Sequence, residues 1–202
     1  MQSTRVGGAP VTTTDYARIS ATLLSSFLAA MVGGAVMAVV MIVAFTVFQR
    51  TDLLFALRPI GAYLFGDAIL LGPTPMMYVG AVAFHFGICA LWGFLFAIAA
   101  SVLRVERSTG GAVLLGVIIG LASQIIDINL VTPPLLFGLW GHDIWTEMVP
   151  PLYSWLAHVA FGLSFAVAPA LFRPLWRRFG GRDEELPESV PEENAFDDPR
   201  IR

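Results

Sequence analysis

Four long apolar stretches constrain the fold of this chain more than any other feature. They cover about residues 20–48, 77–103, 110–131 and 152–172. As a helix, each stretch would be roughly 30 Å long or more, which matches the hydrocarbon core of a bilayer. Only 13% of the 202 residues are charged, about half the fraction typical of soluble domains. The sequence therefore predicts an all-α integral membrane protein with four transmembrane helices.

The arginines predict how these helices are oriented. They gather in the N-terminal segment, between the second and third stretches, and after the fourth, whereas the other two links hold only Arg50 and Arg58. Positive residues favour the cytoplasmic side, so both termini are expected in the cytoplasm, at a bacterial inner membrane. The outer links, residues 51–76 and 132–151, are predicted to form short amphipathic segments at the outer surface.

The whole chain divides into three parts. Residues 1–18 are predicted to be a polar N-terminal tail, residues 19–178 the transmembrane domain, and residues 179–202 an acidic, disordered cytoplasmic tail. Within the domain, GGAVMAVVMI (33–42) resembles GGAVLLGVII (110–119), and WGFLFAIAASVLR (92–104) resembles FGLSFAVAPALFR (161–173). These matches predict two similar helical hairpins.

Polar residues inside the predicted helices alternate with small residues at helical spacing. The set comprises His85, Cys89, Ser123, Gln124, Asp127, Ser154 and His158. Small residues let membrane helices approach closely, so these polar groups are expected on packing seams. Their depths predict that His85, His158, Gln124 and Asp127 converge in the outer half of the bundle. We expect the third helix to end at Pro133 and Pro134, and Asp127 to bond one of the two histidines.

Three functions are compatible with this cluster. Two histidines on separate helices are typical of haem b ligands, so His85 and His158 are candidate cofactor residues in a haem- or quinone-associated redox subunit. Gln124 and Asp127 are candidates for a proton or ion pathway in a small transporter. More often, polar groups of this kind only hydrogen-bond across a seam, which favours a non-catalytic accessory or structural subunit.

Catalysis and metal binding have little support. No nucleophile elbow, phosphate-binding loop or dinucleotide fingerprint occurs, and a single cysteine, Cys89, excludes an internal disulfide. His142, Asp143 and Glu147 in the second outer link resemble a metal site only loosely, and no metal site is predicted. The arginines after the fourth stretch flank a membrane helix, so a nucleic acid is not expected. The expected partners are lipid and either other membrane subunits or further copies of this chain.

The second half of the chain resembles the YagU-like family of bacterial inner-membrane proteins. The similar features are a basic link, a glycine-rich third span, an aromatic outer link, and the residues Phe96-Ala97, Ser123-Gln124, Pro133-Pro134 and His158. The chain departs from the family pattern at His85, which lies one turn before the expected position near Cys89, and at Asp127, where another polar type is expected. The biochemical role of the family is not established, so the resemblance implies the topology and no activity.

Overall fold

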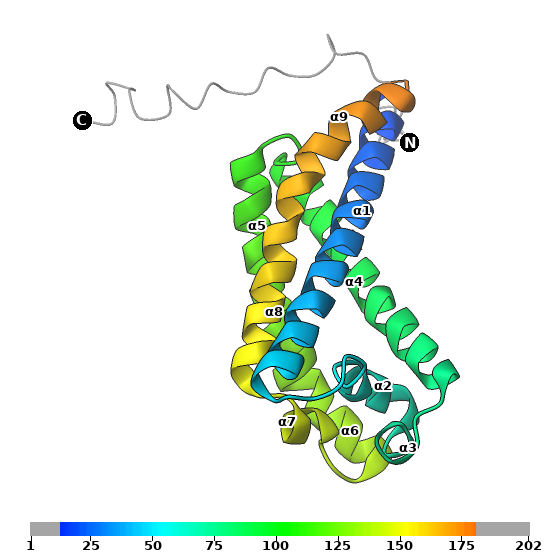
Figure 1. Ribbon diagram of the computed structural model, residues 1–202. Helices are drawn as coiled ribbons and strands as arrows, with labels where there is room; N and C mark the ends of the chain where they lie inside the picture. The colour runs from blue at the N-terminus through cyan, green and yellow to red at the C-terminus, as the bar shows by residue number, and fades with distance from the viewer. Residues whose placement is uncertain (1–12, 181–202) are drawn as a thin grey trace, which may run out of the picture.

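A computed structural model describes residues 13–180, which are almost entirely helical (Figure 1). The long helices are α1 (Thr13–Val43) with its π-helical end η1 (Ala44–Phe48), α4 (Pro75–Leu103), α5 (Thr109–Ser123) with the π-helix η2 (Gln124–Val131), and α8 (Pro151–Leu163) with the 3₁₀ turn η3 (Ser164–Val167) and α9 (Ala168–Arg178). Four short helices complete the described chain: α2 (Leu57–Phe65), α3 (Ala68–Leu71), α6 (Thr132–Trp140) and α7 (Ile144–Met148).

Four helical stretches are long and apolar enough to cross a membrane. They are Asp15–Phe48, Pro75–Leu103, Thr109–Trp140 and Pro151–Arg178. Many of their leucine, valine and phenylalanine side chains are exposed on the outside of the bundle, where a bilayer can solvate them. The prediction of an all-α membrane protein with four spans is therefore confirmed.

The short helices gather at one end of the bundle and form a cap, defined here as α2, α3, α6 and α7 (Figure 1). At the opposite end, the start of α1 lies beside α9 (Figure 1), where Ala17 and Ala21 pack against Phe172 and Trp176. The described chain therefore begins and ends on the same side of the bundle, away from the cap.

Small residues set the closest helix contacts, as the sequence predicts. Gly93 of α4 lies against Ala30 of α1, and a Cβ added at Gly93 would come within 2.6 Å of the Ala30 Cβ. On the other side of the bundle, a Cβ at Gly162 of α8 would meet the backbone of Gly116 in α5. These seams bring the backbones of α1 and α4, and of α5 and α8, into direct contact.

The third span does not end where the sequence predicts. The helix continues from η2 through Pro133 and Pro134 into α6 and ends at Trp140, so the expectation that the prolines close it is wrong. Both prolines stand in the first turn of α6, where a missing amide N–H is tolerated. The hydroxyl of Thr132 also donates to the carbonyl oxygen of Asp127 at 2.6 Å, which helps to satisfy the backbone at this junction.

The N-terminal boundary also differs from the prediction. Residues 13–18, assigned to a polar tail, already belong to α1. Arg18 is accommodated there because its guanidinium forms an ion pair with Glu106 and donates to the carbonyl oxygen of Ser101. Residues 1–12, and residues 181–202 of the predicted acidic tail, lie outside the described residues.

The internal repeat stays a prediction. The first pair of matching segments differs in depth, because GGAVMAVVMI lies in the second half of α1 whereas GGAVLLGVII starts at the second residue of α5. In the second pair, Gly93 and Gly162 both lie at close helix contacts, against α1 and α5 respectively.

Candidate functional site: a cavity beneath the cap

A cavity of about 300 Å³ lies where α1, α4, η2 and α8 meet the cap. Its wall is mostly apolar, from residues that include Met37, Met41, Phe84, Ile88, Ile128, Val131, Leu135 and Trp145. Besides the indole N–H of Trp145, five residues bring polar groups to it: Tyr63, His85, Asp127, Thr132 and His158. An apolar hollow with a few convergent polar groups is the usual form of a small-molecule site.

The two histidines predicted to converge do line this one cavity. His85 on α4 places Nε2 2.9 Å from the carbonyl oxygen of Gly34 in α1. His158, which is only 5% exposed, places Nδ1 2.8 Å from the carbonyl oxygen of Ser154, one turn earlier in α8. A carbonyl oxygen can only accept, so these nitrogens donate. In each neutral ring the other nitrogen therefore carries the lone pair.

Asp127 also lines the cavity, but its partner is not the predicted one. Its Oδ2 accepts a hydrogen bond of 2.6 Å from the indole Nε1 of Trp92 in α4, and neither histidine bonds it among the described residues. The expectation of an Asp127–histidine bond is therefore wrong. The sequence held a signal for Trp92, because Trp92 follows His85 by seven residues, two turns along the same face of a helix.

A short hydrogen-bond chain links the cap to the third span. The hydroxyl of Tyr63 in α2 contacts the hydroxyl of Thr132, which in turn donates to the carbonyl oxygen of Asp127. Because the Thr132 proton is used on Asp127, the Tyr63 hydroxyl is the donor in the first bond. Asp127 itself lies in η2, a π-helix of eight residues, and π-helical turns are frequent at functional sites.

The other members of the predicted polar cluster lie behind the cavity wall. Gln124, 1% exposed, accepts a hydrogen bond from Ser154 at 2.6 Å and donates to Asn129. The hydroxyl of Ser123 donates to the carbonyl oxygen of Gly120. Cys89 is buried beside the His85 ring, with its Sγ 3.8 Å from Nε2. Gln124 and Ser154 thus support the backbone turn that holds His158, while Ser123 and Cys89 pack on the seams.

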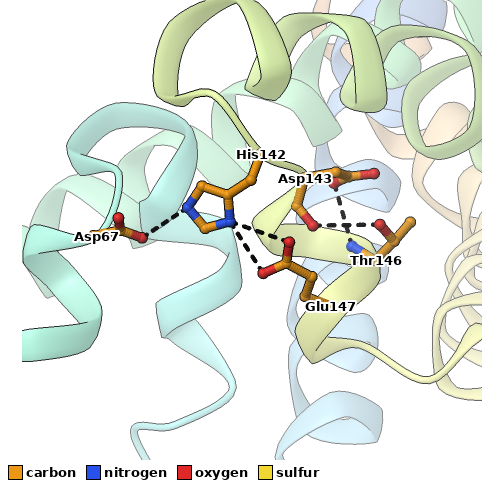
Figure 2. A network of polar contacts seen from close by, with 5 residues as sticks. All are labelled: Asp67, His142, Asp143, Thr146 and Glu147. Atoms are coloured by element: carbon orange, nitrogen blue, oxygen red, sulfur yellow. Dashed lines mark hydrogen bonds and ion pairs between the residues drawn. The ribbon is translucent and has the colours of Figure 1, made fainter.

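A second polar network joins the two links of the cap (Figure 2). His142 lies between two acids, with Nδ1 3.0 Å from Glu147 and Nε2 3.1 Å from Asp67. These carboxylates raise the pKa of His142 above its ordinary value, mainly through the hydrogen bond to Glu147. Asp143 instead caps α7 by accepting from the amide of Thr146. Among the described residues, no three His, Cys, Asp or Glu side chains are placed to hold a metal ion.

The fold and the cavity together define the class: a polytopic α-helical membrane protein. No protein-family model, curated protein or solved structure matches the chain.

Proposed function

We propose that this chain is a non-catalytic membrane protein that binds a small, largely apolar molecule in the cavity beneath its cap. It acts either alone or as an accessory subunit of a membrane assembly. The observation that carries the proposal is the cavity itself, because His85, His158, Asp127, Tyr63 and Thr132 are each held there by a hydrogen bond to another helix or to their own backbone. Such fixed groups lower the ordering cost of binding.

The positive-inside bias supports an orientation with the cap outside a bacterial inner membrane and both termini in the cytoplasm. In that orientation the cavity lies in the outer half of the bilayer, and the cap lies between it and the outer solution.

The two alternatives have weaker support. A cavity of about 300 Å³ is at the small end of cofactor sites, so bis-histidine haem ligation would need more room. We expect the purified protein to lack a Soret band. A proton pathway from Asp127 through Gln124 is disfavoured because Gln124 bonds Ser154 and Asn129 and does not line the cavity.

Photolabelling tests the proposal. The probe is 4-phenylbutanol carrying a photoreactive diazirine, with unlabelled 4-phenylbutanol as competitor, on protein in nanodiscs of zwitterionic lipid. We expect saturable labelling of α1, α4 and η2 that the competitor removes. Ala38 lines the cavity, so Ala38→Phe should abolish it. Ala35 lies on the same helix but is exposed, so the matched variant Ala35→Phe should label normally.

Labelling spread over the lipid-facing surface, unaffected by competitor and equal in both variants, would show that the cavity does not bind such molecules.

A further inference from the structure

Apart from the indole of Trp145, the polar groups around the cavity share one property: their donors are already used. His85 donates to Gly34, His158 donates to Ser154, and the Tyr63 and Thr132 hydroxyls form the chain that ends at the Asp127 carbonyl. The Trp92 indole N–H, which approaches from α4, is used on the Asp127 carboxylate.

What remains for a ligand is a set of acceptors. These are Nδ1 of His85, Nε2 of His158 and Oδ1 of Asp127, none of which has a hydrogen-bond partner among residues 13–180. The one donor without a partner among the described lining residues is the indole N–H of Trp145. Residues that line the cavity therefore carry three acceptors without a partner, one of them on a carboxylate, and a single donor without one.

Acceptors of this kind select a ligand that brings its own N–H or O–H groups. A quinone offers only carbonyl acceptors, and a carboxylate ligand would be repelled by Asp127. An ammonium group brings two or three donors and a positive charge, and charged hydrogen bonds to a carboxylate are about twice as strong as neutral ones. The faces of Tyr63, Phe84 and Trp145, which line the cavity, attract cations further.

Size and spacing favour an organic cation over a metal ion. Among the described residues, no three His, Cys, Asp or Glu side chains are placed to hold a metal ion, whereas an ammonium group needs only one carboxylate as its charged acceptor. The cavity of about 300 Å³ has roughly twice the volume of one known to hold a benzene ring. It can therefore hold a ring with a short chain and a small head group.

We infer that the ligand is a hydrophobic organic cation, with an ammonium group held by Asp127 and an apolar body against α1 and η2. This inference rests on the proposed function, because it names the ligand class of the same cavity.

Three probes of similar shape test the inference: 4-phenylbutylamine, 4-phenylbutanol and 4-phenylbutyrate. Each competes against the photolabel on protein in nanodiscs at neutral pH, and empty nanodiscs correct for partitioning into lipid. The amine should compete at a concentration at least about tenfold lower than the alcohol, and the carboxylate should be the weakest. Asp127→Asn should weaken the amine at least about tenfold and leave the alcohol nearly unchanged. Asp52→Asn, the same change at an exposed acid outside the cavity, should alter neither.

The outcomes separate the two claims. If the alcohol or the carboxylate competes as well as the amine in the wild-type protein, the cation inference is wrong while the cavity still binds small molecules. If none of the three competes, the proposed function fails as well. The wild-type ranking decides the matter even if Asp127→Asn does not fold.

Discussion

At the scale of single residues, the chemistry of the cavity depends on which polar atoms are already hydrogen-bonded. Asp127 is an acid in an apolar span, yet Trp92 bonds one of its carboxylate oxygens, and the residue lines the cavity. His85 and His158 could be placed near each other from their depth in two helices. The tautomer of each ring could not be predicted, because it depends on which backbone carbonyl the ring contacts. His85 meets the carbonyl of Gly34 on another helix, whereas His158 meets the carbonyl of Ser154 on its own helix.

Gly162 gives the clearest prediction at this scale. A Cβ there would meet the carbonyl oxygen of Gly116 and come within 3.0 Å of the Val117 Cα, all backbone that cannot turn aside. Gly162→Ala should therefore lower the free energy of unfolding by about 1–3 kcal/mol, as measured by denaturant unfolding in detergent micelles.

The matched control is Gly87→Ala on α4, where a new Cβ meets nothing within 4 Å. It should raise the free energy of unfolding by about 0.5–1 kcal/mol, the usual gain of alanine over glycine inside a helix. Equal effects of the two variants would mean that α5 and α8 do not pack as tightly as described.

At the scale of elements, the apolar runs predicted the four spans because hydrocarbon demands long, internally hydrogen-bonded helices. The continuation of the third span through Pro133 and Pro134 could not be predicted. Proline usually marks the end of a helix, but here both prolines fall in the first turn of α6, directly after a π-helix. The cap was expected only as unspecified amphipathic segments. Its order comes from long-range contacts, such as Trp140 against the backbone of Gly66, which no local pattern reveals.

The cap also carries a pH prediction. In Figure 2 both nitrogens of His142 face a carboxylate oxygen, of Glu147 and of Asp67, and only the doubly protonated ring donates to both. Because these acids raise the pKa of His142, its contribution is complete below the ordinary value of about 6.5. That contribution is lost as the pH rises through the raised pKa.

Hydrogen exchange, corrected for the intrinsic pH effect, measures this. Protection of residues 57–76 and 141–149 should be full below about pH 6.5 and fall as the pH rises above it, and His142→Gln should remove most of the change. A fall that persists unaltered in His142→Gln would assign the pH effect to another group.

At the scale of the whole molecule, the described chain enters and leaves on the side opposite the cap (Figure 1). The arginine bias predicts that this side faces the cytoplasm. In a Cys89→Ala background, a membrane-impermeant maleimide added to intact spheroplasts should label Gly72→Cys in the cap link. It should label Thr109→Cys, at the start of α5 on the other side, only after permeabilisation. The reverse pattern would invert the topology and place the cavity in the inner half of the bilayer.

The central claim is that this bundle holds one small molecule beneath its cap. Equilibrium binding of radiolabelled 4-phenylbutanol to the protein in nanodiscs, with uptake by empty nanodiscs subtracted, tests it most directly. We predict saturation near one molecule per chain in the wild type and in Ala35→Phe, and no saturable component in Ala38→Phe. Uptake that rises linearly with concentration in all three proteins would contradict the claim.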